Sequence, residues 1–213
     1  MAGSCETCGP IENTDINKVT DVDGNTYKTV TIGSQVWMAE NLKTTKFNDR
    51  TDIPNSNNSK DWSSLASPGY CWFNNDAASN KITYGALYNW YTIGTGKVCP
   101  SGWHVPSSTE WINLITYLGG ENGAGGKLKE IGTVNWISPN SSTTNETGFT
   151  ALPGGYRDLN GTYFNFKSVG YWWSSTESFT NYASILILYN NAGNISRSDY
   201  IKQSGLSVRC IKD

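Results

Sequence analysis

The chain has 213 residues and a formal net charge of −2, and its Lys and Arg residues form no cluster. Neutralising the phosphates of a nucleic acid requires such a cluster, so we expect no nucleic-acid partner. The longest apolar run, ILIL at 185–188, is far too short to span a bilayer.

Aromatic residues and glycine are abundant, with 9 Trp, 12 Tyr and 22 Gly, whereas only 16% of the residues are charged. This composition is typical of a loop-rich extracellular module, in which rigid aromatic side chains fill the core and glycine shapes the turns. The length fits one globular domain. We expect a flexible N-terminal tail over residues 1–20 and a single domain over 21–213.

Five cysteines bear on the compartment of the protein: Cys5, Cys8, Cys71, Cys99 and Cys210. The three in the body of the chain are far apart, and His104 is the only histidine, so no Cys/His zinc site is expected. Widely spaced cysteines favour a disulfide in an exported protein, with one thiol left over. The alternative is a set of buried free thiols in a cytosolic protein.

The first residues, MAGSC, resemble the end of a bacterial lipoprotein signal, in which small residues precede the cysteine that receives the lipid. Cys5 is therefore a candidate lipid anchor. The alternative is that these are vector-derived residues ahead of the tail.

The sequence predicts that the folded part begins with a hairpin turn and a strand. Asp23-Gly24 is a typical hairpin turn, and YKTVTI at 27–32 alternates as a half-buried strand does. Residues 48–69 are rich in Asn, Ser and Pro and indicate a long surface loop. GYCWFNND at 69–76 follows as a short aromatic strand.

A helix is expected next, within TYGALYNWYTIG at 83–94. Ala86, Leu87, Trp90 and Tyr91 would share one helical face, and Gly94 would end the helix.

The strongest local signal is a second helix within 107–120. Ser107 and Glu110 have the spacing of a capping box, in which the two side chains satisfy free amides at a helix start. Capping is a better interpretation of Glu110 than a general acid. Apolar residues follow at helical spacing: Trp111, Leu114, Ile115 and Leu118. Gly119-Gly120 would end the helix.

Short elements fill the rest of the chain. A short helix is expected at 125–132 and strands at 162–166, 170–177, 182–189 and 206–213. Helices in the first half and many short strands in the second indicate the α+β class.

Four motifs occur in order: CPSGWHVPSSTEW, TNETGFTALPGGYRD, GYWWSSTES and GLSVRCIKD. Together they resemble the Fibrobacter succinogenes major paralogous domain family of exported and surface lipoproteins, over roughly residues 21–213. The resemblance implies a C-type-lectin-like fold with two main helices, mostly antiparallel strands and termini close together. This fold is shared with formylglycine-generating enzymes.

The resemblance does not carry over a catalytic or metal site. Formylglycine-generating enzymes use a pair of cysteines near the C-terminus, and Cys210 stands alone there. The residue motifs of calcium-dependent lectins are also missing. We therefore expect no enzyme, no cofactor and no metal, with an oxidase or hydrolase on this scaffold as the alternative.

In lectin-like folds the regions around Cys99 and Cys210 are neighbours, so the resemblance implies that these two residues form a disulfide and that Cys71 is a buried thiol. Trp172 and Trp173 are adjacent, so in a strand one ring would point away from the core. Trp172 is a candidate sugar-stacking platform, with packing under a loop as the alternative. Four other tryptophans are expected mainly in the core: Trp103, Trp111, Trp136 and Trp173.

Residues 180–201 contain no Lys, Glu, Gln, Met or Trp, although these types make up 33 of the 213 residues. By composition alone such a window arises about one time in forty. Several relatives with this lectin-like fold diversify their binding face by substituting adenines in a template. Starting from AAT or AAC codons, this substitution cannot produce any of the five residue types. The alternative is a β-strand with a buried side, which explains the composition of 182–189 well but not that of the polar continuation.

We therefore expect an adhesin-like recognition module, cell-surface or secreted and monomeric, that binds a protein or glycan. A purely structural envelope or fibre domain is the other alternative. Tyr, Asn and Ser are the residue types of adaptable binding surfaces. The expected ligand-binding surface is exposed and irregular and consists of Asn190, Asn191, Asn194, Ser196, Arg197, Ser198 and Tyr200. Tyr182, Ser184 and Tyr189 extend it, and Trp172 is a further ligand-binding candidate. Alternation does not decide which side of 182–189 is buried, and a strand covered on both faces also fits.

Overall fold

The fold was obtained as a computed structural model, which describes residues 17–213. Cys5, Cys8 and the remaining residues of 1–16 lie outside this range, and so does the candidate lipid anchor. The folded part begins before residue 21, because strand β1 (Lys18–Thr20) pairs antiparallel with β2 (Thr26–Ile32) across the expected Asp23-Gly24 turn. Residues 18–20 were therefore wrongly placed in the tail.

The described residues form an α+β structure, as expected. The helices are α1 (Ser59–Ser63), α2 (Ala77–Tyr84), α3 (Trp90–Ile93), α4 (Ser108–Tyr117) and α5 (Glu121–Leu128), with a 3-10 turn at Phe73–Asn75. The further strands are β3 (Gln35–Met38), β4 (Tyr70–Cys71), β5 (Leu87–Tyr88), β6 (Trp103–His104), β7 (Tyr156–Arg157), β8 (Tyr163–Phe164), β9 (Val169–Phe179), β10 (Tyr182–Tyr189), β11 (Ile195–Ile201) and β12 (Ile211–Lys212).

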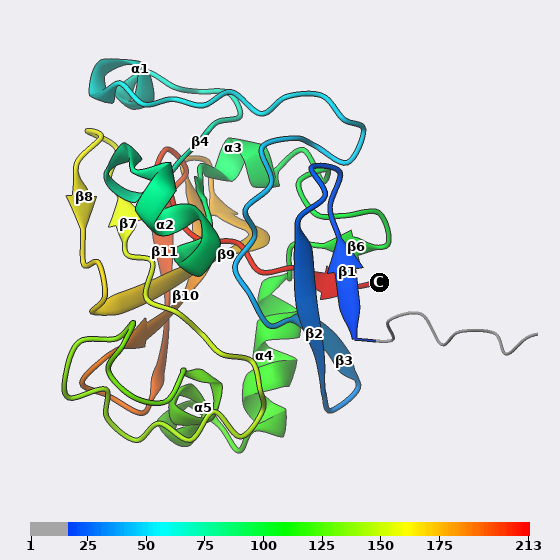
Figure 1. The fold of residues 1–213 in the computed structure, drawn as a ribbon, viewed down its shortest axis with the longest axis vertical. Helices are drawn as coiled ribbons and strands as arrows, with labels where there is room; N and C mark the ends of the chain where they lie inside the picture. The colour runs from blue at the N-terminus through cyan, green and yellow to red at the C-terminus, as the bar shows by residue number, and fades with distance from the viewer. Residues whose placement is uncertain (1–16) are drawn as a thin grey trace, which may run out of the picture.

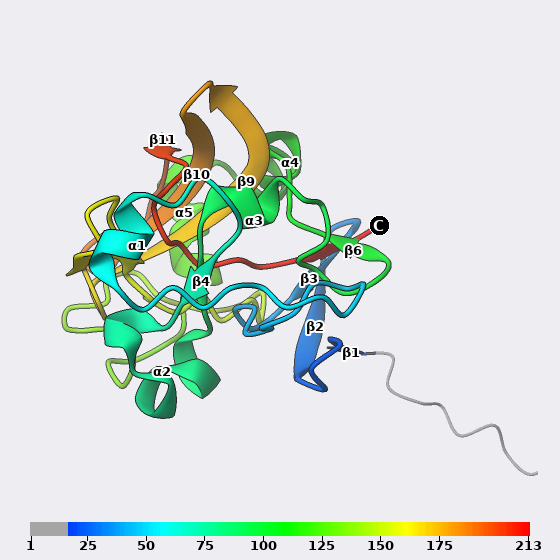
Figure 2. The same ribbon diagram turned by 90° about the horizontal axis from the view of Figure 1, so that it is seen from above.

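Two antiparallel sheets organise the molecule. One has the strand order β1-β2-β3-β12-β6, so the first and last strands of the described chain share a sheet, and the other has the order β11-β10-β9. The first sheet and the C-terminus lie on one side, with α4 between this sheet and β9–β11 (Figure 1 and Figure 2). Apolar residues from both sheets and from α4 form one continuous core cluster.

Helix α4 begins where the sequence predicts. The Ser107 hydroxyl accepts the backbone amide of Glu110, and the Glu110 carboxylate accepts the backbone amide of Ser107 at 2.7 Å. Trp111, Leu114 and Ile115 are buried on one face of the helix. The capping box is confirmed.

The helix expected within 83–94 is wrong in its first half. Helix α2 ends at Tyr84, and Gly85 has φ 75°, a left-handed conformation that breaks the helix and that glycine adopts readily. Leu87 then belongs to β5, which pairs with β4. Only α3 remains helical, and the Asn89 side chain caps it by accepting the amide of Thr92.

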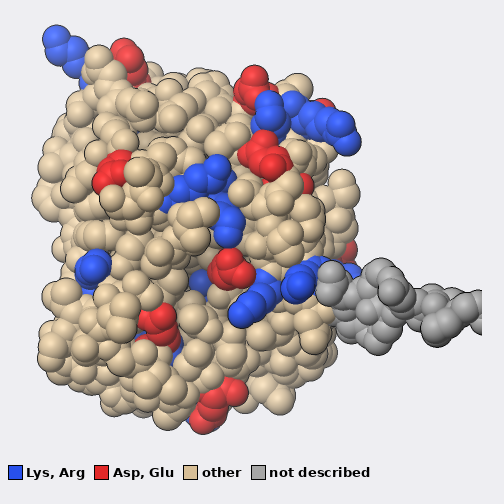
Figure 3. Space-filling model, in the orientation of Figure 1, with Lys and Arg blue, Asp and Glu red and all other residues tan. Residues whose placement is uncertain are grey.

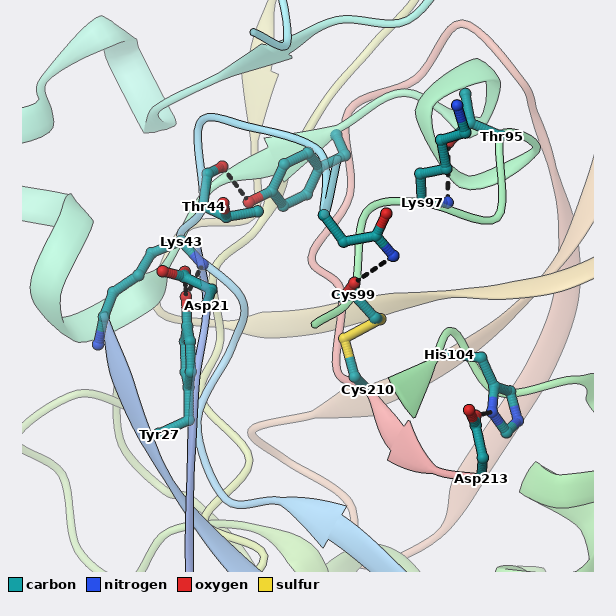
Figure 4. The surroundings of a disulfide bond; sticks show 12 residues. Asp21, Tyr27, Lys43, Thr44, Thr95, Lys97, Cys99, His104, Cys210 and Asp213 are labelled. Carbon is teal, nitrogen blue, oxygen red and sulfur yellow. Dashed lines mark hydrogen bonds and ion pairs between the residues drawn. A yellow bond between two sulfur atoms is a disulfide. The ribbon is translucent and has the colours of Figure 1, made fainter. Parts of the chain in front are cut away.

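The disulfide Cys99–Cys210 is confirmed, and it joins the segment before β6 to the segment before β12 (Figure 4). Cys71 is a buried free thiol, as expected, and burial raises its pKa to about 11. Of the four tryptophans expected in the core, three are fully buried, whereas Trp103 is half-buried against the core cluster.

A buried cation, Arg209, contacts two segments that are distant from it in the sequence. Arg209, in the last motif, is fully buried and donates to the Phe149 carbonyl and, at 3.0 Å, to the Asn41 side chain. Its guanidinium also lies 4.1 Å from the centre of the Phe149 ring. Burial lowers its pKa to about 9.

No helix within residues 17–213 has the length and apolarity needed to cross a membrane.

Candidate ligand-binding site

Strand β10 is the middle strand of the β11-β10-β9 sheet, and both of its faces are covered. Ile185 and Ile187 pack into the core cluster that contains Trp173, while Leu186 and Leu188 pack into the cluster that contains α4. The apolar half of segment 180–201 is therefore a strand buried on both faces, which is one of the alternatives that the alternating pattern allowed.

Residues 190–194 of the polar half form the β10–β11 turn. Residues 195–201 form the regular edge strand β11, so the expectation of an irregular surface is wrong for this part. Its residues pair antiparallel with β10, with Asp199 opposite Ser184 and Arg197 opposite Leu186. Because side chains alternate along a strand, Arg197 and Asp199 point to the α4 side and Tyr200 to the opposite side. The order of the sheet leaves β11 with a single strand neighbour among the described residues.

A first groove lies between the N-terminal end of α4 and the face of this sheet. It has a volume of about 340 Å³. Its residues are Ser108, Trp111, Ser174, Ser184, Ile185, Leu186, Arg197, Ser198 and Asp199. The hydroxyls of Ser108 and Ser174 lie 3.2 Å apart, and Ser184 donates to the Asp199 carboxylate at 3.1 Å. The groove is thus lined by small hydroxyl side chains over an apolar floor.

A second groove lies at the other side of β11, with a volume of about 270 Å³. Its residues are Tyr156, Asp158, Leu159, Tyr182, Asp199, Tyr200, Ile201 and Ser204. The rings of Tyr156 and Tyr200 pack edge to face, with their centres 5.3 Å apart. The centres of the Tyr200 and Tyr171 rings are 5.9 Å apart. Burial beside Tyr156 raises the pKa of Tyr200, so its hydroxyl stays protonated at neutral pH.

Two side chains of β11 connect the grooves. Asp199 lines both the first and the second groove. Arg197 lines the first groove and a third, of about 190 Å³, beside α4. The Arg197 guanidinium is paired with the Glu121 carboxylate at 2.8 Å, which fixes it against the start of α5. The three hollows share these residues of β11, and we refer to them together as the trough.

The described side chains offer no candidate metal site. Within residues 17–213 the structure contains no group of three or more His, Cys, Asp or Glu side chains arranged to hold a metal ion.

The comparison with protein families decides which family the chain represents. The family model described as the Fibrobacter succinogenes major domain matches residues 30–212. The chain belongs to this family. The resemblance carried by the four sequence motifs is therefore confirmed. No curated protein and no solved structure matches the chain.

In this member of the Fibrobacter succinogenes major domain family, five expected ligand-binding residues do line the trough: Tyr182, Ser184, Arg197, Ser198 and Tyr200. Their exposure differs, because Tyr182 is 44% exposed whereas Tyr200 is partly buried against its tyrosine neighbours.

The assignment of Trp172 as a ligand-binding residue is wrong. Both Trp172 and Trp173 are fully buried, and the Trp172 indole donates to the Asn41 side chain at 2.9 Å. Adjacent rings on opposite sides of a strand both become buried when each face of the sheet is covered, as here. The sugar-stacking hypothesis is removed for this position.

The remaining expected residues lie outside the trough, and most are at the β10–β11 turn. The Asn190 side chain donates to the carbonyls of residues 137 and 138, and its backbone carbonyl accepts the amide of Ser141. Asn191 is exposed, whereas the others are partly buried: Tyr189, Asn190, Asn194 and Ser196. The turn is held against the 137–142 loop and does not extend the trough.

Several residues of the trough were not predicted. Asp199 lies within segment 180–201, and its place between two expected residues was the signal that could have found it. Tyr156, Asp158 and Leu159 come from the GGYRD motif, and Ser108 and Ser174 come from two other motifs. Only the folded chain brings these segments beside β11.

Proposed function

We propose that this protein is an exported or cell-surface recognition module, which binds a protein or glycan ligand without catalysing a reaction, on a C-type-lectin-like fold. The binding surface is the trough along β11. One observation carries the proposal: expected ligand-contacting residues from β10 and β11 line two adjoining grooves that share Asp199.

Residue chemistry supports binding over catalysis. The first groove offers serine hydroxyls, and the second offers tyrosine rings, which are rigid and amphipathic. The described histidine, His104, lines neither groove. Export is supported by the disulfide Cys99–Cys210, because such bonds persist in oxidising compartments.

The composition of segment 180–201 supports a diversified origin of this surface. Tyr182, Ser184, Ser198 and Tyr200 are residue types that adenine substitution in asparagine codons produces, and all four line the trough. Ile185 to Leu188 are buried on both sides of the sheet. Variation would therefore change the ligand at the rim while the buried strand holds the fold.

The test is a binding screen of the full chain against a glycan array and a library of extracellular proteins, followed by substitution of the trough. The variant Tyr182→Ala with Ser198→Arg removes one exposed ring of the second groove and places a large cation at an exposed β11 position that lines the first groove. Tyr117→Ala is the matched control, since Tyr117 is 66% exposed on α4 and lies outside the trough. We expect ligands that bind the wild type and the Tyr117→Ala control not to bind the trough variant. Ligands that bind the trough variant as tightly as the wild type would contradict the proposal.

A further inference from the structure

Two carboxylates of the trough have no cationic partner among the described residues. Asp199 is exposed and accepts one hydrogen bond, from the Ser184 hydroxyl. Asp158 accepts the backbone amides of Asn160 and Thr162, at 2.9 and 2.7 Å, on one of its oxygens. The second Asp158 oxygen accepts only a long contact from the Asn160 side-chain amide, at 3.5 Å, so both carboxylates keep acceptor capacity. Both residues line the second groove.

The neighbouring carboxylates differ, because each is already neutralised. Glu121 is paired with Arg197 at 2.8 Å, and Glu177 is paired with Lys202 at 2.7 Å. Arg197 is thereby engaged and does not offset the charge of Asp199. The face shown in Figure 3 likewise has acidic and basic residues interspersed, with no large area of one sign. The uncompensated negative charge is thus a local property of the second groove.

The wall of that groove also suits a cation. Tyr156, Tyr182 and Tyr200 line it together with the two carboxylates. A Lys or Arg side chain gains from tyrosine ring faces through cation–π attraction and buries its aliphatic stem against apolar surface. A volume of about 270 Å³ accommodates one such side chain. Tyrosines alone would also fit a sugar ring, but a neutral sugar would leave both carboxylates without a counter-charge.

The edge position of β11 favours a peptide over other cationic ligands. Among the described residues β11 has a strand on one side only. A free strand edge offers backbone donors and acceptors to an extended peptide, whose alternate side chains enter neighbouring pockets. Arg197 and Asp199 are two positions apart and join three hollows in a row, which matches the repeat of an extended chain.

We infer that the ligand of this surface is an extended basic segment of a protein partner, with one Lys or Arg side chain seated in the second groove between Asp158 and Asp199. The inference rests on the proposed function and specifies its ligand class. The peptide lies along β11, and the serine-lined groove accepts a neighbouring side chain of the same segment.

The probe is a phage-displayed library of random dodecapeptides selected on the full chain, with a glycan array run in parallel. Enriched peptides are synthesised with Arg and with its neutral isostere citrulline. They are measured against wild type, the double variant Asp158→Asn with Asp199→Asn, and the control Glu146→Gln. Glu146 carries the same charge but lies outside the trough, where it pairs with Lys127. Asparagine keeps the size and the accepting oxygen of each aspartate, and the thermal unfolding midpoint checks the fold.

We expect enriched peptides to contain Lys or Arg, and to lose about tenfold in affinity with citrulline or with the double variant, but not with Glu146→Gln. Binding by wild type should also weaken as NaCl rises from about 50 mM to about 500 mM. Uncharged peptides or glycans that bind the trough, with no loss in the double variant, would overturn the ligand class and leave the proposed function standing. The absence of any binder sensitive to the Tyr182→Ala, Ser198→Arg variant would overturn both.

Discussion

The ammonium group of Lys129 donates a hydrogen bond to the backbone carbonyl of Tyr189 at 2.9 Å, and so ties the end of α5 to the end of β10. The same group donates to the carbonyls of Ser141 and Ala192, at 3.0 and 2.8 Å. Lys129 is fully buried, and burial lowers its pKa to about 8. Three carbonyl acceptors around one nitrogen match the three N–H donors of the charged ammonium form.

Replacing Lys129 with Met should destabilise the fold, because three buried carbonyls lose their donor. Hydrogen bonds to a charged group contribute about 1.5–3 kcal/mol, so we expect a loss of about 3 kcal/mol in the free energy of unfolding, measured with urea. Lys127→Met is the control, since Lys127 makes only a surface ion pair with Glu146 at 3.1 Å and should change stability by about 0.5 kcal/mol or less. Equal losses in the two variants would contradict a special role for Lys129.

The place of Trp172 in the core, and not in the binding surface, can be tested directly. Its ring is fully buried and its indole donates to Asn41. Trp172→Ala should therefore cost about 3–5 kcal/mol in the free energy of unfolding, as for other buried aromatic residues. Tyr182→Ala, at an exposed position on the neighbouring strand, should cost far less. A stable Trp172→Ala variant would show that the ring does not belong to the core.

The sequence predicts those features that depend on a few adjacent residues. The capping box at Ser107 and Glu110 and the turn at Asp23-Gly24 are set by local hydrogen bonds and backbone conformation, and both are present. The helix expected within 83–94 fails in its first half because the apolar spacing of Leu87 and Trp90 also fits a strand followed by a short helix. The position of Gly85, with its left-handed φ, decides between them.

The binding surface is predictable only in part, for a different reason. Segment 180–201 has a distinctive composition, and this led to Ser184, Arg197 and Tyr200, which line the trough. Composition cannot report which side of a strand is covered, so Trp172 was misplaced. Nor can it reveal that Asp158 and Asp199 line the same groove, because this depends on the contact between Tyr156 of β7 and Tyr200 of β11 in the folded chain.

The disulfide should contribute strongly to stability, because Cys99 and Cys210 are 111 residues apart in sequence. In the chain-entropy model, closing a loop of this length stabilises a fold by about 5 kcal/mol. The double variant Cys99→Ser, Cys210→Ser should lose about this amount, measured by urea unfolding. Peptide mapping of the native protein without reductant should show Cys99 linked to Cys210, and Cys71 should react with iodoacetamide only after unfolding. A Cys71 adduct formed on the native protein would contradict its burial.

His104 is placed to make stability depend on pH. One ring nitrogen lies 2.6 Å from Asp213 and the other 2.8 Å from Glu110, the residue of the capping box. Figure 4 shows His104 and Asp213 facing each other close to the disulfide. Burial lowers the pKa of His104, but the hydrogen bonds and charges of Asp213 and Glu110 outweigh it and raise this pKa. For Glu110, burial raises the pKa, but hydrogen bonds from Ser107 and His104 outweigh it and lower this pKa.

Because the folded state holds the His104 proton more tightly than the unfolded state, the stabilisation is fully present below the unfolded pKa of about 6.5 and is lost as pH rises through the raised folded pKa. The lowered pKa of Glu110 acts in the acidic range, where stability falls as that carboxylate becomes protonated. We therefore expect the free energy of unfolding of wild type, relative to His104→Gln, to be larger at about pH 5.5 than at about pH 8.5. Urea titrations of both proteins across this range provide the measurement. A difference that stays constant with pH, or grows toward pH 8.5, would show that the imidazole is not held in its charged form by Asp213 and Glu110.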